Sequence, residues 1–212
     1  MTFLKVVILG APGCGKTALV KQFVTHSFPE THVATEKPEY YYPSIFADNS
    51  LFELRITDLP PIVAFPKSTI EEWTLYQGYG LRSANAFLLI LDITSAESFK
   101  FAKSIKEQWQ TSGLDTPFVM VSNKWDLVHR GTSSDGKSDM STEHYKKELA
   151  NAIKKQWKCP YVECSAKYNW NVTTVFKEVV TQLEKLPSPN RYSFKSFNGQ
   201  SKSSRKRTCP FL

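Results

Sequence analysis

The sequence predicts an α/β fold, a single domain in which a mostly parallel six-stranded sheet carries helices on both faces. Three observations lead to this prediction. Continuous apolar runs, such as Ala86–Leu91, are typical of strands that are covered on both sides. Helical patterns alternate with these runs along the chain, as parallel strands require. Polar motifs directly follow several runs, at the sheet edge where open α/β folds bind ligands.

The first predicted strand, Val6–Leu9, leads into a glycine-rich loop and then a helix over about 16–25. Glycines let successive N–H groups point inward at an anion, and the helix adds the positive end of its dipole. Lys16 would reach the β- and γ-phosphates, and the Thr17 hydroxyl would hold Mg²⁺. The full spacing and the Lys-Thr pair disfavour the alternative, a glycine turn before an ordinary helix. The predicted phosphate site is Gly10, Ala11, Pro12, Gly13, Cys14, Gly15, Lys16 and Thr17.

A polar stretch, 26–38, separates the first helix from a predicted hairpin. Its strands are Tyr40–Ala47 and Leu51–Thr57, joined by the turn Asp48–Ser50. Pro60-Pro61 ends the second strand abruptly. The hairpin would add one antiparallel edge strand to a sheet that is otherwise parallel.

Strands and helices then alternate to the end of the predicted domain. An irregular loop over 60–70 precedes a short helix at about 70–80, and 129–140 reads as a second loop. Further strands are predicted at 86–91, 118–121 and 161–164, and further helices at 95–110, 141–157 and 172–186.

Asn123-Lys124-Trp125-Asp126 follows the strand at 118–121 and predicts which base is bound. The Asp126 carboxylate can accept two hydrogen bonds from guanine, at N1–H and the exocyclic amine. Adenine presents different groups there and would leave buried polar atoms unpaired, so it is rejected. Asn123 would brace the loop, and the stem of Lys124 would lie on the base. As a bare string the motif also fits a solvated strand end.

Cys164-Ser165-Ala166-Lys167 closes the next strand. Here the Ala166 N–H could donate to guanine O6, and Lys167 could pack over the base. Each motif is weak alone, but three in this order, each after a predicted strand, indicate one nucleotide site.

These motifs resemble those of the Ras-like small GTPases, and the resemblance covers residues 3–186. It implies a P-loop G domain that binds GTP and GDP with Mg²⁺ and hydrolyses GTP. It further implies that Phe28 stacks on guanine, that Thr35 closes on Mg²⁺ and the γ-phosphate, and that Asp58 holds the metal through water. The alternatives are that Phe28 is simple core, that Thr31 takes the role of Thr35, and that Asp58 is an ordinary strand-end residue.

The chain departs from the family pattern where the family has Asp-x-x-Gly-Gln. Pro61 replaces the glycine whose N–H contacts the γ-phosphate, and proline has no N–H. Ile62 replaces the glutamine that orients the attacking water. Pro12 would crowd an incoming arginine finger. We therefore expect slow GTP hydrolysis. No side chain is assigned as the catalytic residue, and Lys16 and Thr35 would have supporting roles in the reaction. The alternative is a rearranged loop that supplies other groups.

Several stretches are similar to the Ras-like family ten branch: 58–66, 157–159 and 161–170. The Ras effector segment is not reproduced, because Glu36-Lys37-Pro38 follows Thr35. Ras effectors therefore need not bind, and the effector and exchange factor stay unassigned.

Composition fits a neutral domain with a basic tail. The net charge is +7, but residues 187–212 carry six lysines or arginines and no acid. A nucleic-acid binder would be basic throughout, so we expect no nucleic acid partner. The four cysteines fit no zinc spacing and indicate a reducing compartment. We expect a monomer without a signal peptide or membrane span.

The chain is thus predicted to comprise a GTP-binding domain, 1–186, and a disordered basic tail, 187–212. The tail ends in Cys209-Pro210-Phe211-Leu212, a C-a-a-X box that favours geranylgeranylation of Cys209. One lipid binds weakly, and the basic residues would supply the second signal. We expect attachment to the cytoplasmic face of a membrane, the plasma membrane in particular. The alternatives are a solvated tail and a nuclear-import patch.

Two function classes remain open. The chain is either a slow GTPase acting as a signalling switch or a GTP-binding interaction module that barely responds to hydrolysis. Pro61 and Ile62 favour the second class, while the intact phosphate and base motifs permit the first. Asp126 disfavours a third class, a P-loop kinase or other ATPase.

Overall fold

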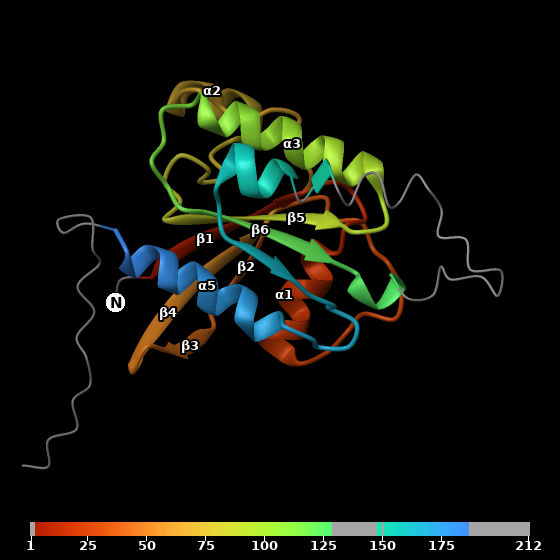
Figure 1. Cartoon of the computed structure of the whole chain (residues 1–212). Coiled ribbons are helices and arrows are strands. Elements are labelled where there is room, and N and C mark those ends of the chain that lie inside the picture. Colours follow the sequence, from red (N-terminus) through yellow and green to blue (C-terminus); the bar gives the residue numbers. More distant parts are fainter. Residues whose placement is uncertain (1–2, 129–147, 150, 187–212) are drawn as a thin grey trace, which may run out of the picture.

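The computed structural model describes residues 3–128, 148–149 and 151–186. Its core is a seven-stranded mixed sheet with the order β2-β4-β1-β5-β6-β7, in which β3 also pairs with β4 (Figure 1). The strands are β1 (Leu4–Gly10), β2 (Glu39–Tyr41), β3 (Ser44–Ala47), β4 (Ser50–Asp58), β5 (Ala86–Asp92), β6 (Phe118–Asn123) and β7 (Tyr161–Glu163). The helices are α1 (Lys16–Thr25), α2 (Thr69–Tyr76), α3 (Ala96–Gln110), η1 (Trp125–Leu127), η2 (Ala152–Trp157) and α5 (Val172–Glu184). The predicted α/β class is confirmed.

The sheet has one strand more than predicted. The predicted strand at 40–47 is divided into β2 and β3, both antiparallel to β4, and Pro43 lies between them. Proline cannot donate to a strand ladder, which explains the interruption. The Pro43 carbonyl still accepts a hydrogen bond from the Leu54 N–H at 2.9 Å, so the two pieces remain on one sheet.

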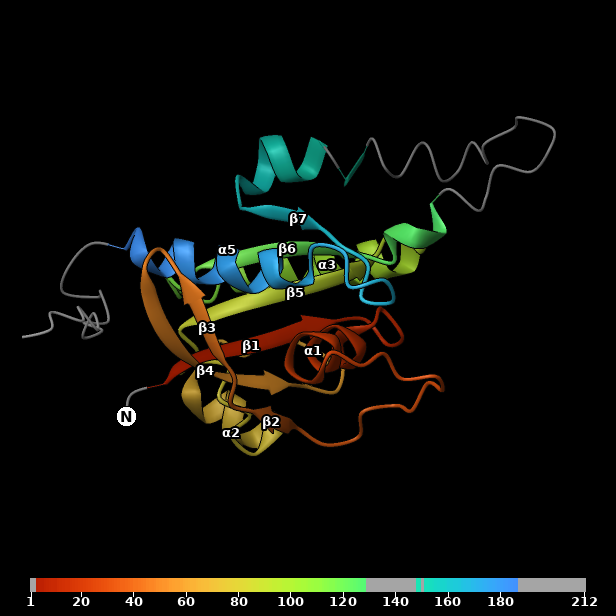
Figure 2. The ribbon, with the colours of Figure 1, turned by 90° about the horizontal axis from the view of Figure 1, so that it is seen from below.

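Alternating side chains of β1 enter two separate cores. Val6 and Ile8 belong to a cluster under α1 and α5, whereas Val7 and Leu9 belong to a cluster under α3. Figure 1 shows α1 and α5 on one face of the sheet and α2 and α3 on the other, and in Figure 2 α1 and α5 lie in front of the strands. Burial on both faces explains why the central strands are apolar without interruption.

The helix termini follow local sequence signals. Ser68 caps α2, because its side chain accepts a hydrogen bond from the Glu71 N–H, and Ser95 caps α3 through the Ser98 N–H. The helix α2 is shorter than predicted, since Gln77 adopts a left-handed conformation that ends it before Gly78.

Three predictions fall wholly or partly outside the described residues: the loop at 129–140, the start of the helix at 141–157, and the tail at 187–212. The described end of that helix is η2, which has π-helical hydrogen bonding. The strands β1, β4, β5, β6 and β7 run parallel, so their carboxyl ends meet at one edge. The predicted site residues lie at or near this edge.

Candidate functional site: a nucleotide cavity at the sheet edge

The loop between β1 and α1 needs glycine at two positions for lack of space. A Cβ atom on Gly10 would lie 2.4 Å from the Ile90 carbonyl oxygen, and one on Gly15 would lie 2.4 Å from Asn123 Nδ2. Gly15 also has φ +92°, a backbone conformation that favours glycine. The loop is therefore packed directly against the strand that carries Asn123.

The helix α1 begins at a residue that cannot cap it with a side chain. Its N-cap is Gly15, so no side-chain capping hydrogen bond is made by that residue. The first N–H groups of a helix attract anions, and a phosphate group is a natural partner for them. Lys16 is nearly buried, and its ammonium donates to the carbonyls of Gly10 and Ala11 at 3.0 and 3.1 Å. The structure thus places this cation inside the loop.

Three oxygen-bearing side chains meet beside the start of α1. The Thr17 hydroxyl donates to Asp58 Oδ2 at 2.5 Å and lies 2.8 Å from the Thr35 hydroxyl. A hydroxyl has one hydrogen, so Thr35 must donate to Thr17. Although these residues are far apart in sequence, the structure brings all three predicted metal-holding residues together. Thr35, rather than Thr31, makes this contact.

The chemistry of this oxygen cluster fits a divalent cation. Asp58 is buried, and burial raises the pKa of its carboxyl to about 6. Among the residues that the structure describes, its second oxygen, Oδ1, has no hydrogen-bond partner. An unpaired buried oxygen among hydroxyls suits Mg²⁺, which prefers oxygen ligands. Asp58 is therefore not an ordinary strand-end residue.

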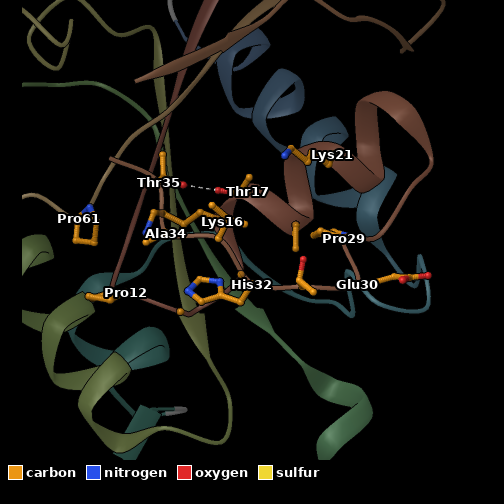
Figure 3. A pocket seen from close by; sticks show the side chains of 15 residues that line it. Pro12, Lys16, Thr17, Lys21, Pro29, Glu30, His32, Ala34, Thr35 and Pro61 are labelled. Atoms are coloured by element: carbon orange, nitrogen blue, oxygen red, sulfur yellow. Dashed lines mark hydrogen bonds between the residues drawn. The ribbon is translucent and has the colours of Figure 1, made fainter. Parts of the chain in front are cut away.

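A cavity of about 340 Å³ adjoins the phosphate loop (Figure 3). Lys16, Thr17 and Thr35 line it together with Pro12 and Pro61, the two prolines that depart from the family pattern. Pro61 is exposed and lines the cavity.

A second cavity, of about 470 Å³, continues from the first, since residues 29–32 line both. Phe28, Asp126 and Lys167 line the second cavity. Phe28 is 41% exposed, so it is not simple core. The two volumes suit the phosphate and base halves of a nucleotide, since ligand pockets commonly have this size.

Asn123, at the end of β6, is hydrogen-bonded to two loops of the site. Its Nδ2 donates to the Cys14 carbonyl at 3.1 Å, while its Oδ1 accepts from the Ala166 N–H at 3.0 Å. The bracing role predicted for Asn123 matches this geometry. The prediction for Ala166 differs from the structure, because its N–H is engaged by Asn123 rather than directed freely at a base.

The side chain of Asp126 is oriented by Ser165, whose hydroxyl donates to Asp126 Oδ1 at 2.6 Å. The Ser165 oxygen in turn accepts from the Tyr168 N–H at 3.3 Å. Asp126 also lines the second cavity. The hydrogen bond from Ser165 thus orients a carboxylate that faces this cavity.

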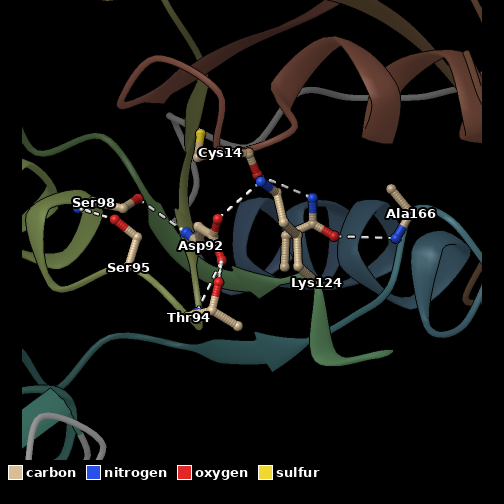
Figure 4. A network of polar contacts seen from close by, with 8 residues as sticks. Cys14, Asp92, Thr94, Ser95, Ser98, Lys124 and Ala166 are labelled. Atoms are coloured by element: carbon tan, nitrogen blue, oxygen red, sulfur yellow. Dashed lines mark hydrogen bonds and ion pairs between the residues drawn. The ribbon is translucent and has the colours of Figure 1, made fainter. Parts of the chain in front are cut away.

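One site residue, Asp92, was missed by sequence reasoning. Its Oδ2 pairs with the Lys124 ammonium at 2.8 Å, and its Oδ1 accepts two hydrogen bonds from Thr94 (Figure 4). Lys124 has φ +65°, and the ion pair fixes its stem along the base half of the cavity. The sequence does contain one indication of its role, because Asp92 is an acidic residue directly after the apolar stretch at 86–91, at the end of a buried strand.

The structure gives Ile62 a place that the sequence did not indicate. Its side chain is 2% exposed and packs in the core with Leu59 and Phe65, so it does not stand where a water could be oriented. The next side chain, Val63, is 90% exposed. Positions 61 and 63 are exposed while position 62 between them is buried, which alignment to a family motif cannot reveal.

Hydrogen bonds fix this loop further. The Tyr76 hydroxyl accepts from the Ala64 N–H at 2.9 Å and donates to the Ala64 carbonyl at 2.6 Å. The Phe65 N–H donates to Gln108 Oε1 at 2.7 Å. The loop between β4 and α2 is thus attached to both α2 and α3.

Comparison with known proteins agrees with this geometry. A family model described as "Ras family" matches residues 5–185. The chain belongs to the Ras family. Ras-family proteins are small GTPases that bind guanine nucleotides, and the arrangement of the phosphate loop, Asn123 and Asp126 accords with that membership.

Two of the similar relatives are Ras-like protein family member 10 proteins, and a third is a Di-Ras protein. Ras-like protein family member 10B from Homo sapiens is 37% identical over 183 residues, covering 84% of this chain and 85% of the relative. Ras-like protein family member 10A from Mus musculus is 35% identical over 184 residues, covering 84% of each. GTP-binding protein Di-Ras1 from Homo sapiens is 31% identical over 180 residues, covering 84% of this chain and 80% of the relative. The predicted resemblance to the family ten branch is confirmed.

Proposed function

We propose that this Ras-family protein binds GTP and GDP with Mg²⁺, hydrolyses GTP slowly and signals at a membrane. The observation that carries the proposal is the pair of joined cavities, one lined by the phosphate loop and the other by Asp126. A triphosphate would fill the first cavity and a guanine base the second.

Each half of the cavity has a defined task. The N–H groups at the start of α1 and the Lys16 ammonium would bind the β- and γ-phosphates, with Lys16 leaving the carbonyls that it now contacts. Thr17 and Thr35 would hold Mg²⁺ directly, and Asp58 would hold it through water. When bound, this ion would neutralise charge that develops on the phosphates. Asp126, oriented by Ser165, would select guanine.

Slow hydrolysis follows from what the γ-phosphate end of the cavity lacks. Pro61 faces this end and cannot donate a backbone hydrogen bond. Pro12 lines the same end and would hinder an arginine finger. The Ile62 side chain is turned into the core and cannot orient water. Neither proline affects the α- and β-phosphate contacts, so nucleotide binding should persist.

A second candidate is a GTP-binding interaction module with little hydrolysis-driven switching. The attached loop between β4 and α2 favours it, because a conformational response there would expose buried side chains. Single-turnover hydrolysis of bound GTP separates the candidates. A measurable slow rate with a change of conformation supports the switch, and an undetectable rate supports the module.

Base selection is tested by competition binding with GTP, ATP and XTP. We expect the chain to prefer GTP, and Asp126→Asn to weaken GTP binding and admit XTP, because the amide no longer accepts two hydrogen bonds from guanine. Ser165→Ala should weaken GTP binding without admitting XTP, since the carboxylate remains but loses its orientation. Equal affinity of the original chain for ATP and GTP would reject the guanine assignment.

Membrane attachment through Cys209 and the basic tail is part of the proposal and concerns residues outside the described ranges. Within the described ranges, none of the helices combines the length and hydropathy needed to cross a bilayer. We expect Cys209→Ser to move the protein from the plasma membrane to the cytosol, as measured by fractionation. Cys159→Ser is the matched control, and undiminished membrane recovery of the Cys209 variant would reject the lipid attachment.

A further inference from the structure

The ends of β5 and β6 place an acid and a lysine side by side at the base half of the nucleotide cavity. Asp92 and Asn123 are partners in the parallel ladder, so Lys124 comes directly after the position opposite Asp92. Lys124 has φ +65°, a backbone conformation that is uncommon outside glycine, and its ammonium lies 2.8 Å from Asp92 Oδ2 (Figure 4). The sharp turn of the chain at Lys124 thus goes together with this ion pair.

The stem of Lys124 lies between the phosphate loop and the base half of the cavity. Lys124 lines the base half, and a Cβ atom on Gly15 would lie 4.0 Å from Lys124 Cε. A lysine side chain has many rotamers, and fixing it in one of them costs conformational entropy. A partner that holds the ammonium before the nucleotide arrives therefore lowers the entropic cost of binding.

Asp92 is itself held in place by the start of α3. Its Oδ1 accepts hydrogen bonds from the N–H and the hydroxyl of Thr94, at 2.9 and 2.7 Å, and its N–H donates to the Ser98 hydroxyl at 2.9 Å. The Ser95 hydroxyl, which caps α3, accepts from the Ser98 N–H at 3.1 Å. The side chains of Asp92 and Lys124 are 12% and 32% exposed, so solvent screens their attraction less than that of a surface pair.

We propose that Asp92 is a positioning residue that, through Lys124, sets how slowly a bound nucleotide is released. The inference rests on the function proposed above, because it requires a guanine nucleotide in the cavity. Asp92 is not among the described residues that line either half of this cavity, so its effect passes through Lys124. Without Asp92 the ammonium loses its partner, the stem leaves its fixed rotamer, and the base is held less firmly. GDP and GTP carry the same base, so both should be affected equally.

The test measures the dissociation rates of GDP and of a non-hydrolysable GTP analogue from the full chain. Asp92→Asn keeps the size of the side chain but removes its charge, and we expect both nucleotides to leave roughly five- to twentyfold faster. The factor should be the same with Mg²⁺ and after its chelation, because the contact between Thr17 and Asp58 is not altered. Glu97→Gln is the matched control. It removes an acid from the first turn of α3, but Glu97 pairs with Lys100, so release should match that of the original chain.

A double-mutant cycle separates positioning of Lys124 from general support of the fold. Lys124→Met removes the ammonium and keeps an unbranched stem. In that background Asp92→Asn should not speed release further, because the pair is already broken. Thr94→Val removes one hydrogen bond to Asp92 and should speed release by roughly two- to threefold, again only while Lys124 is present. This variant tests the inference independently if Asp92→Asn does not fold.

Unchanged release from Asp92→Asn, or from Thr94→Val if the first variant does not fold, would overturn the inference. Additive effects in the cycle would also overturn it, because Asp92 would then support the fold and not Lys124. Faster release of the GTP analogue alone, or only when Mg²⁺ is present, would place the effect at the phosphate half and contradict the inference as well. Failure of the original chain to bind either nucleotide would overturn the proposed function, whereas tight binding with unchanged release would overturn the role of Asp92 alone.

Discussion

Two loops flank the phosphate end of the nucleotide cavity, and they are attached to the molecule in different ways. The loop at 26–38 is exposed along most of its length, and the Thr35 hydroxyl ties it to Thr17. The loop at 59–68 buries Leu59, Ile62 and Phe65 and is hydrogen-bonded to α2 and α3. One loop is joined to the site through a polar contact, and the other is part of the core.

This difference determines which loop can respond to a nucleotide. A polar contact such as Thr35 to Thr17 can be exchanged for a contact with a ligand at little net cost. Movement of the second loop would expose apolar side chains, at about 25 cal/mol for each Å². We therefore expect the conformational response to nucleotide to be concentrated in 26–38.

The largest expected effect concerns the buried loop. Ile62→Ala should lower the free energy of unfolding by about 2–4 kcal/mol, because it removes methyl groups from a packed core. Val63→Ala, at the adjacent exposed position, should change it by less than about 0.5 kcal/mol. Urea denaturation measures both. Equally small effects would mean that the loop is not part of the core, and the contrast between the two loops would disappear.

The second prediction concerns the exposed loop. Thr35→Ala should weaken Mg²⁺-dependent binding of a non-hydrolysable GTP analogue by roughly tenfold, because a hydroxyl of the oxygen cluster is lost. Thr31→Ala removes a hydroxyl from the same loop and should have a smaller effect. Titrations with and without Mg²⁺ measure the difference. A larger loss in the Thr31 variant would transfer the metal role to that residue.

The third prediction tests both loops in one experiment. Hydrogen exchange should slow in 26–38 when the GTP analogue replaces GDP, whereas exchange in 59–68 should change little. The reason is that the second loop is already fixed by Ile62, Phe65 and the Tyr76 hydroxyl. Exchange measured by mass spectrometry gives the answer for each segment. A comparable change in 59–68 would show that burial does not prevent switching and would favour the signalling switch.

Local patterns explain why much of this architecture could be predicted from the sequence. Gly15, Lys16 and Thr17 are neighbours in the chain, so their spacing alone indicates a phosphate loop. Pro43 can also be read from the sequence, but its effect depends on whether the segments before and after it both pair with β4. That pairing is a property of the whole sheet. Motifs made of neighbouring residues were therefore easier to predict than the pairing of strands.

The features that the sequence did not predict depend on contacts between residues that are far apart in the chain. The pairing of Asp92 with Lys124 joins the ends of two parallel strands, and no local pattern specifies it. The Ala166 N–H is engaged by Asn123, more than forty residues away in the sequence. The orientation of Ile62 depends on the core beneath the loop. In each case packing between distant segments determines where the group points.

The smallest expected effect concerns catalysis. Pro61→Gly restores a backbone N–H at the γ-phosphate end of the cavity, and we expect single-turnover GTP hydrolysis to rise by roughly three- to tenfold. Restoration of the family glutamine by Ile62→Gln should not add to this rate, because the side chain would enter the core and destabilise the fold. Pro12→Gly should add to the gain in the presence of an activating protein that supplies an arginine.

Loss of a proline also loosens the loop, so the gain needs a control that separates flexibility from hydrogen bonding. Pro60→Gly loosens the same loop but adds its N–H one position before the residue that faces the cavity. If Pro60→Gly and Pro61→Gly raise the rate equally, mobility of the loop limits hydrolysis. If only Pro61→Gly raises the rate, the slow hydrolysis is caused by the missing N–H at residue 61. The loop at 59–68 would then already be placed so that a backbone N–H at this residue can contact the γ-phosphate.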